Sequence, residues 1–321
     1  MRKLAAAAVS IALVIGLFGA AEAIADQPAC GSIVAQDTTL TSDLDCTGAS
    51  APGGFALTVT APGVTLDLDG HAIRLSDLRS GVSALLAGVT IENGLIAGAG
   101  DDGPGGLLPC ALGVQGFGLT VRDVTIERCF WGMDLLNSDN TVVRNVVRDY
   151  ATDLPYPLTG VGIRIRSGEL PSIPERNLVA RNLVSNPAGG PFAIDAEAGI
   201  SIPFGDDNIV ERNAVARTGI GIEVGGRDNV VTRNDVLNPE RAGSTGIVVS
   251  GEGGPLVDRN TVSGFGGDGI ALSSPGIVAH KNRASSNGGL GIRGVPGVVD
   301  AGGNLAFANG DPLQCLYVDC K

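Results

Sequence analysis

The sequence predicts an all-β solenoid, in which successive turns of the chain stack on one another. Three observations indicate this fold: a repeat of 21 to 37 residues, short stretches in which apolar residues alternate with other residues, and asparagine or glycine at fixed places in most repeats. The plainest copy lies in the range Asn208 to Leu237, where Val210 and Asn213 recur 21 residues later as Val231 and Asn234. A repeat of this length is typical of solenoids.

The repeat extends over ten units that share one corner position. An apolar residue lies three positions before each corner, from Leu68 in the first unit to Ala301 in the last, and another lies two positions after it. We expect the asparagines among these residues to stack as an internal ladder, because an amide tolerates a left-handed corner and can bond to its neighbours above and below. The corner positions are His71, Gly94, Val124, Asn145, Asn182, Asn213, Asn234, Asn260, Asn282 and Asn304.

Each unit also holds a second apolar pair, usually preceded by glycine. Alternation over three positions predicts a short strand with one buried face, and the glycine is expected to provide a sharp entry into that strand. The first members of the pair are Leu57, Val82, Leu112, Met133, Ile163, Ile200, Ile222, Ile247, Ile270 and Ile292. No unit has the 3.6-residue period that a helical solenoid needs, which leaves stacked strands.

Coils of this length with an asparagine corner resemble the right-handed parallel β-helix of pectate-lyase-like proteins. The resemblance covers Leu57 to Ala306, and the stretch Cys30 to Ile73 looks like the start of bacterial secreted proteins built from such repeats. It implies a right-handed parallel β-helix of about ten coils. We therefore expect a single domain with an N-terminal cap (residues 26–56), the β-helix (57–306) and a C-terminal cap (307–321), because an open β-helix would expose its apolar bore at both ends.

The first 25 residues are typical of a secretory signal peptide. Arg2 and Lys3 precede an apolar run, and the small residues Ala23 and Ala25 follow it. We therefore expect a secreted or cell-envelope protein whose mature chain is a monomer without a membrane span.

The chain has six cysteines, an even number that fits three disulfides in an oxidising compartment. Their order suggests pairing Cys30 with Cys46, Cys110 with Cys129, and Cys315 with Cys320.

The charge of the chain restricts its partners. A formal net charge of −12 argues against nucleic acid, which binds basic surfaces. Zinc and copper sites are not expected, because the chain has only two histidines and no two cysteines with the two-residue spacing of a structural zinc site. Calcium is the one possible cofactor, at Asp206 and Asp207 or at Asp101 and Asp102, although adjacent carboxylates alone do not make a site.

Three long inserts follow the corners at 94, 145 and 182, on neighbouring coils. Long loops on a rigid scaffold often carry function. Aromatic side chains beside carboxylates can stack on and hydrogen-bond to sugars, although aromatics more often pack loops onto the protein. The candidate substrate-binding residues are Trp131, Tyr150, Tyr156, Phe192, Asp195, Glu197 and Ser201.

The candidate catalytic residues face outward from the second apolar strand: Asp134, Arg164, Arg166 and Glu223. An arginine can neutralise a uronate carboxylate while a base removes the adjacent proton, which is the chemistry of a lyase or an epimerase. Asp134 and Glu223 are expected three coils apart, roughly 14 Å, which is too far for a glycosidase acid–base pair. The alternative for Asp134 and Arg164 is a surface ion pair without function.

The motifs of characterised relatives are not present. The chain lacks the DPHD motif of alginate epimerases and the NTD and GHG motifs of polygalacturonases, so the resemblance implies none of those activities. We expect a protein that binds or cleaves an acidic polysaccharide. The alternative is a non-catalytic surface or envelope repeat protein that presents its loops to a partner.

A column of basic residues immediately precedes the asparagine ladder. It consists of Arg144, Arg181, Arg212, Arg233, Arg259 and Lys281. Stacked like charges repel, and a bound polyanion would relieve that repulsion. In an acidic chain, however, the pattern favours a solvated ridge screened by Glu211, Asp235 and Asp258.

Overall fold

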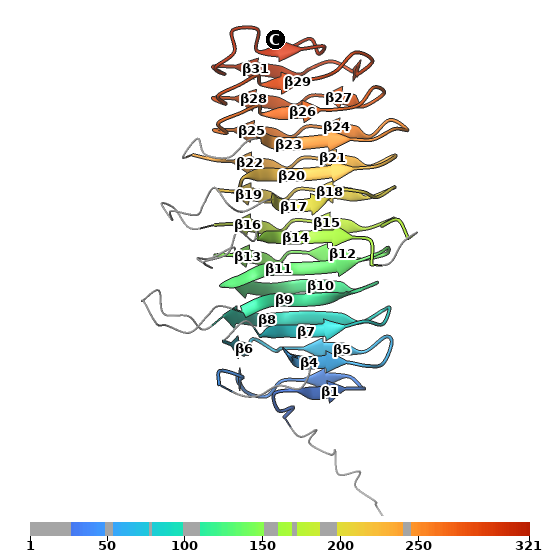
Figure 1. Cartoon of the computed structure of the whole chain (residues 1–321), viewed down its shortest axis with the longest axis vertical. Helices are drawn as coiled ribbons and strands as arrows, with labels where there is room; N and C mark the ends of the chain where they lie inside the picture. The colour runs from blue at the N-terminus through green and yellow to red at the C-terminus, as the bar shows by residue number, and fades with distance from the viewer. Residues whose placement is uncertain are drawn as a thin grey trace, which may run out of the picture.

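A computed structural model describes most of the chain and places it in one solenoid. The described residues are 27–48, 54–76, 79–98, 110–150, 160–168, 172–186, 198–239 and 245–321. The predicted signal peptide and most of each of the three inserts lie outside them. Within the described residues, the extended regular elements are β-strands that pair in parallel with the coil before and the coil after (Figure 1).

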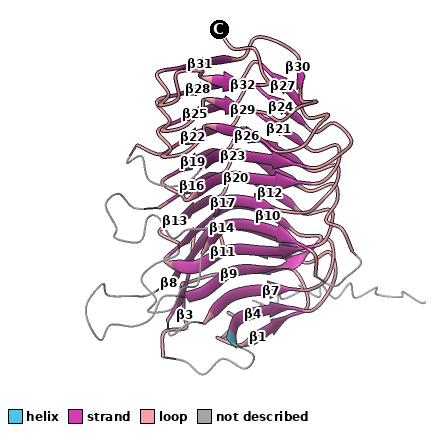
Figure 2. Cartoon of the chain, turned by 45° about the horizontal axis from the view of Figure 1, so that its top comes forward, coloured by secondary structure: helices cyan, strands magenta, loops and turns pink. Residues whose placement is uncertain are grey.

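The strands form three faces along the solenoid axis. The first face is one sheet, seen as a stack of strands in Figure 2. Its strands are β1 (Ser32–Val34), β4 (Phe55–Val59), β7 (Ser80–Ala84), β9 (Cys110–Phe117), β11 (Cys129–Leu136), β14 (Val161–Arg166), β17 (Ala198–Ile202), β20 (Ile220–Gly225), β23 (Thr245–Ser250), β26 (Ile270–Leu272), β29 (Ile292–Arg293) and β32 (Cys315–Leu316).

The second and third faces are joined by two long strands, β8 (Thr90–Gly98) and β10 (Thr120–Glu127), which run through both. The second face also holds β2 (Thr38–Thr39), β5 (Thr65–Asp67), β12 (Thr141–Val143), β15 (Leu178–Ala180), β18 (Ile209–Glu211), β21 (Val230–Thr232), β24 (Leu256–Asp258), β27 (Val278–His280) and β30 (Val299–Asp300). The third face also holds β3 (Leu44–Asp45), β6 (Ala72–Leu75), β13 (Val146–Arg148), β16 (Leu183–Ser185), β19 (Ala214–Ala216), β22 (Asp235–Leu237), β25 (Thr261–Ser263), β28 (Arg283–Ser285) and β31 (Leu305–Phe307).

The core is one continuous apolar column inside the coils. Alternate residues of each strand point inward, as the period of two predicts, and stacked valines such as Val142, Val179 and Val210 are fully buried. The buried cluster runs from Val34 to Val318 along the described residues. The predicted all-β parallel solenoid is therefore confirmed.

Strand pairing extends into both predicted caps. β1, β2 and β3 pair with β4, β5 and β6, so residues 32–45 already form a coil. At the other end, β32 pairs with β29. The three predicted disulfides are confirmed: Cys30–Cys46 and Cys315–Cys320 lie in the two terminal coils, and Cys110–Cys129 joins neighbouring strands of the first face.

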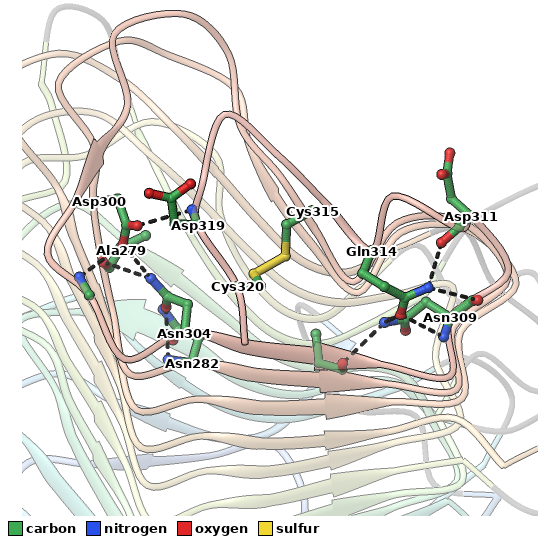
Figure 3. The surroundings of a disulfide bond; sticks show 12 residues. Ala279, Asn282, Asp300, Asn304, Asn309, Asp311, Gln314, Cys315, Asp319 and Cys320 are labelled. Carbon is green, nitrogen blue, oxygen red and sulfur yellow. Dashed lines mark hydrogen bonds between the residues drawn. A yellow bond between two sulfur atoms is a disulfide. The ribbon is translucent and has the colours of Figure 1, made fainter.

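The last coil also satisfies the polar groups at the C-terminal end of the core (Figure 3). Asn304 Nδ2 donates to Asp300 Oδ1 at 2.8 Å, and Asn309 Nδ2 donates to Gln314 Oε1 at 2.9 Å. These side chains take the place of the next coil, whose amides would otherwise be the partners. Buried polar groups without hydrogen-bond partners are costly. The C-terminal cap therefore covers the core and also provides the hydrogen-bond partners that the last asparagines need.

The predicted asparagine ladder is present at the corner between the second and third faces, which we call the second corner. Nδ2 of each asparagine donates to Oδ1 of the next at 3.0–3.2 Å, from Asn145 to Asn304. The same Oδ1 atom also accepts the backbone N–H of the preceding asparagine. Every member is at most 1% exposed, so the ladder is fully internal.

A second asparagine ladder, not predicted from the sequence, lies at the corner between the first and second faces. Asn140, Asn177, Asn208 and Asn229 are joined in the same way, with Nδ2–Oδ1 distances of 2.8–3.0 Å. Each of them lies two residues before a core valine of the second face. This spacing is visible in the sequence, so the pattern could have been found there.

The left-handed residue at the second corner is not the asparagine but the residue before it. Arg144, Arg181, Arg212, Arg233, Arg259 and Lys281 have φ between 52° and 58°. The expectation that the ladder amides take the left-handed conformation was therefore wrong. The asparagine turns its side chain inward, and the preceding residue makes the turn with its side chain outward, exposed to solvent.

The glycine that recurs in or next to most strands of the first face has a different role from the one expected. These glycines do not have a left-handed φ. A Cβ on Gly81, Gly113, Gly132, Gly162, Gly199, Gly221, Gly246 or Gly269 would lie 2.3–2.8 Å from the carbonyl oxygen of the glycine in the next coil. Close packing of neighbouring coils, rather than a sharp entry into the strand, therefore requires glycine here.

The predicted register is wrong at three positions. Leu66 rather than Leu68 pairs with Ile91, because the corner after it is two residues longer. Asp300 rather than Ala301 pairs with Ala279 in the last coil. On the first face Val114, not Leu112, occupies the predicted core position. Apolar alternation continues along β9, so the period alone does not distinguish registers that differ by two residues.

Candidate functional site

The outward row at the middle of the first face holds four of the candidate residues: Asp134, Arg164, Ser201 and Glu223. The register places one residue per coil on this row: Ile33, Thr58, Ser83, Gln115, Asp134, Arg164, Ser201, Glu223, Val248, Ala271, Arg293 and Leu316. Gln115, which follows the core residue Val114, lies on this row, whereas the predicted register with Leu112 in the core would place Gly113 there. Polar and charged residues lie in the middle of the row, and the predicted neighbours Asp134 and Arg164 pair directly.

Asp134 is a buried carboxylate held by two arginines. Its side chain is 3% exposed. Arg164 Nε donates to Asp134 Oδ1 at 2.9 Å, and Arg166 binds both carboxylate oxygens, with Nε on Oδ1 at 2.9 Å and Nη2 on Oδ2 at 2.7 Å. The sequence placed these three residues near one another. It did not indicate that Arg166, two residues further along β14, reaches back to the same carboxylate.

These contacts keep Asp134 charged. Burial alone would raise the pKa of the Asp134 carboxyl, but the hydrogen bonds from Arg166 and Arg164 outweigh it and hold this pKa below its ordinary value. The same pairing raises the pKa of Arg166. A carboxylate that is buried, ionised and bonded at both oxygens is a poor general base. Its geometry is suited to holding two guanidinium groups in place.

Arg164 is fixed between its ion pair and an aromatic ring. Its Cζ atom lies 4.8 Å from the centroid of the Trp131 ring, the distance of a cation–π contact. Trp131 in turn packs on Phe130, with ring centroids 5.3 Å apart. Arg164 uses Nε for Asp134, and its Nη atoms make no hydrogen bond to the described residues. The Arg164 side chain is 22% exposed, so the described residues hold this guanidinium group in place without using its Nη donors.

Glu223 lies further along the same row. Ser201 Oγ donates to Glu223 Oε2 at 3.0 Å, and the Ser201 residue is 5% exposed. The register puts Asp134 and Glu223 three coils apart, as expected. At about 4.8 Å per coil, the two carboxylates do not form a glycosidase pair. The row therefore divides into an arginine cluster around Asp134 and a serine–glutamate pair two coils further on.

The remaining candidates do not join this site within the described residues. Tyr150 packs in the core and is 1% exposed, so the expectation that it contacts a substrate is corrected: it is a buried corner residue. Burial raises the pKa of its hydroxyl. Tyr156, Phe192, Asp195 and Glu197 lie outside the described residues.

No metal site is visible in the part of the chain that the structure describes, because no group of three or more His, Cys, Asp or Glu side chains converges there. Asp206 Oδ1 accepts the backbone N–H of Arg227 at 2.7 Å. Asp207 is a left-handed corner residue with a φ of 56°. Asp101 and Asp102 lie outside the described residues.

No described helix is long and apolar enough to span a bilayer.

A histidine–aspartate pair on the second face was missed in the sequence, where His280 had no evident partner. His280 Nδ1 lies 2.8 Å from Asp258 Oδ1, and Arg259 Nη1 lies 2.6 Å from Asp258 Oδ2. Burial of Asp258 opposes ionisation, but the bonds from His280 and Arg259 lower its pKa overall. His280 and Asp258 pair across neighbouring strands, and the predicted register, in which Val257 and Ala279 both lie three residues before a corner, already places them side by side.

Comparisons with known proteins agree on the fold. The family model described as the right handed beta helix region matches residues 193–310. The periplasmic alginate epimerase AlgG superposes with a TM-score of 0.61 at 16% identity, covering 90% of this chain and 76% of the epimerase chain. A comparison with curated protein sequences gives no match.

Two phage tailspike proteins are similar as well. A mutant tailspike of E. coli bacteriophage HK620 in complex with a pentasaccharide superposes with a TM-score of 0.59 at 12% identity, covering 90% of this chain and 65% of the tailspike chain. The Dettilon tailspike protein gives a TM-score of 0.52 at 18% identity, covering 89% and 60% of the two chains. This chain thus spans less than two thirds of either tailspike chain. These likenesses show the fold: the chain is a right-handed parallel β-helix.

Proposed function

We propose that the protein binds an acidic polysaccharide on its first face, with a carboxylate of the glycan at Arg164 and a sugar ring beside Trp131. The observation that carries this proposal is the state of Arg164: Asp134 holds Nε at 2.9 Å, the ring of Trp131 lies 4.8 Å from Cζ, and the Nη atoms make no bond to the described residues. A guanidinium group binds carboxylates through paired N–H donors.

Local charge supports an anionic ligand despite the acidic chain. Around Asp134 the two arginines outnumber the one carboxylate, which leaves one net positive charge in the cluster. The ion pairs also fix the arginines before a ligand arrives, which reduces the entropy lost on binding. Glycans are ligands or substrates of similar β-helix proteins, since AlgG is an alginate epimerase and the HK620 tailspike was solved with a pentasaccharide.

Within this proposal Asp134 is a positioning residue and not an acid or base. Its oxygens are occupied by Arg164 and Arg166, and its low pKa disfavours proton uptake. If the glycan is also processed, Glu223 is the other carboxylate on the row, and Ser201 holds one of its oxygens. Elimination on a polyuronate would be seen as an unsaturated product that absorbs in the ultraviolet.

The proposal predicts that Arg164→Ala lowers the affinity for galacturonate oligosaccharides at least about tenfold, or about 1.4 kcal/mol, measured by titration calorimetry. The matched control is Arg293→Ala. Arg293 lies on the same row, four coils beyond Ser201, and pairs with Asp268. The Arg293→Ala substitution changes the net charge by the same amount as Arg164→Ala, but it should leave the affinity for galacturonate oligosaccharides unchanged. Equal losses in both variants, or no binding by the unmodified protein, would contradict the proposal.

We also propose that the protein works outside the cytoplasm. Three disulfides close the two terminal coils and join β9 to β11. Such bonds persist in oxidising compartments. An extracellular or periplasmic location agrees with the sequence of residues 1–25 and would bring the first face into contact with envelope or environmental polysaccharides. Fractionation of the producing cells, with a cytoplasmic marker as control, tests this location.

A further inference from the structure

The second corner carries a basic residue in six consecutive coils. These residues, which we call the basic ridge, are Arg144, Arg181, Arg212, Arg233, Arg259 and Lys281. In the coils before and after them the same corner position holds Gly70, Asn93, Asp123 and Gly303. The basic ridge therefore covers only the middle and C-terminal coils. It forms one column because the ladder asparagines that follow its members are stacked coil on coil.

The backbone does not explain why these residues are basic. All six have a left-handed φ of 52° to 58°. Glycine, asparagine and aspartate adopt this conformation most readily, and long side chains are disfavoured. The outer coils use those favoured residues at the second corner. At the first corner, between the first and second faces, the left-handed position is mixed and includes Asp139, Arg176, Asp207 and Asp228. Six successive arginines or lysines thus oppose the local conformational preference.

Ion pairing does not explain them either. Arg144 pairs with Asp123, and Arg259 pairs with Asp258. Arg181, Arg212, Arg233 and Lys281 are exposed and form no ion pair with any described residue. The expected screening by Glu211 and Asp235 therefore does not occur through direct contacts. Four cations of one column are left to repel one another.

We propose that the basic ridge binds a linear polyanion that lies along the solenoid axis, namely a polysaccharide with one carboxylate or sulfate in each repeat. Neighbouring coils are about 4.8 Å apart, so the six charges form a line of about 24 Å. The line is one residue wide and lies on a corner, beside Glu211 and Asp235. A narrow row suits a single extended chain, whereas an anionic lipid surface calls for a broad basic patch.

This second site is separate from the site proposed at Arg164. The second corner lies between the second and third faces, whereas Arg164 faces outward from β14 of the first face. One long polysaccharide, or two different ones, could therefore contact the protein at both places. The inference does not depend on the proposed function, and the two can fail independently.

The test uses the full-length mature protein in an Arg164→Ala background, so that binding on the first face is removed. Polygalacturonate and dextran sulfate are the probes, and binding is measured at rising salt concentration. We expect salt-sensitive binding that falls at least about tenfold when Arg181→Gly, Arg212→Gly and Arg233→Gly are combined, with an unfolding midpoint that is unchanged or higher. A variant with glutamine at the same three positions keeps a long side chain in the unfavoured left-handed conformation. It should lose as much binding as the glycine variant.

The control combines Arg74→Gln, Arg148→Gln and Arg227→Gln, which are exposed arginines elsewhere that remove the same net charge. This control should bind as well as the Arg164→Ala protein. The inference is overturned if that background shows no binding to either polysaccharide, if ridge and control variants lose binding equally, or if vesicles with anionic lipid or duplex DNA bind as tightly as the polysaccharides.

Discussion

Replacing Asn234 with leucine is expected to lower the free energy of unfolding by about 4 kcal/mol. Asn234 Oδ1 accepts the backbone N–H and the Nδ2 of Asn213, and Asn234 Nδ2 donates to Val210 O and Asn260 Oδ1. Leucine fits the apolar core but satisfies none of these groups. The N–H of Asn213 and the carbonyl of Val210 lose their side-chain partner in a site that excludes water, and each such loss costs about 1–3 kcal/mol.

Urea unfolding followed by circular dichroism measures this change. The neighbouring Asp235→Ala is the control, because Asp235 is exposed and should change stability by less than about 0.5 kcal/mol. An Asn234→Leu protein as stable as the Asp235→Ala protein would mean that the ladder does not contribute to stability as its geometry indicates.

Gly246→Ala is expected to destabilise the solenoid by about 3 kcal/mol, a large effect for one methyl group. The new Cβ would lie 2.1 Å from Val262 Cγ1 and 2.6 Å from the carbonyl oxygen of Gly269. A side chain cannot rotate away from a clash at Cβ, and one of the two obstacles is backbone. Neighbouring coils would have to move apart, which would strain the parallel pairing on both sides.

Gly276→Ala separates this steric effect from backbone strain. Gly276 has a φ of 83°, but a Cβ there meets no atom within 4 Å, so its replacement should cost only about 1 kcal/mol. Thermal and urea unfolding of both variants give the comparison. If Gly246→Ala were no more harmful than Gly276→Ala, contact between coils would not be the reason for glycine in this column.

Much of the fold was predictable because each coil of the solenoid places the same kinds of residue at the same core and corner positions. The ladder recurs in seven successive coils, from Asn145 to Asn304, and an apolar core residue recurs beside it, so each unit supports the assignment of the next. The prediction was wrong where a single coil departs from the rule. In β9 apolar residues alternate over more positions than the core needs, and the sequence then fits two registers, with either Leu112 or Val114 in the core.

The site was predictable to the extent that it depends on register. Counting coils was enough to place Asp134 beside Arg164 and to separate both from Glu223. Contacts made by long side chains were not predictable: Arg166 bends back to Asp134, and Arg164 lies over Trp131. The meaning of the basic ridge also required the backbone angles, because only the positive φ values show that arginine is an unfavoured choice at those corners.

The central claim is that Arg164, held by Asp134 beside Trp131, is the carboxylate-binding group of the first face. A crystal structure of the protein soaked with a galacturonate oligosaccharide tests it most directly. We predict a uronate carboxylate within hydrogen-bond distance of the Nη atoms of Arg164, with a sugar ring against Trp131 and the Asp134 ion pairs intact. An oligosaccharide bound elsewhere, with Arg164 unchanged and without a ligand, would contradict the claim.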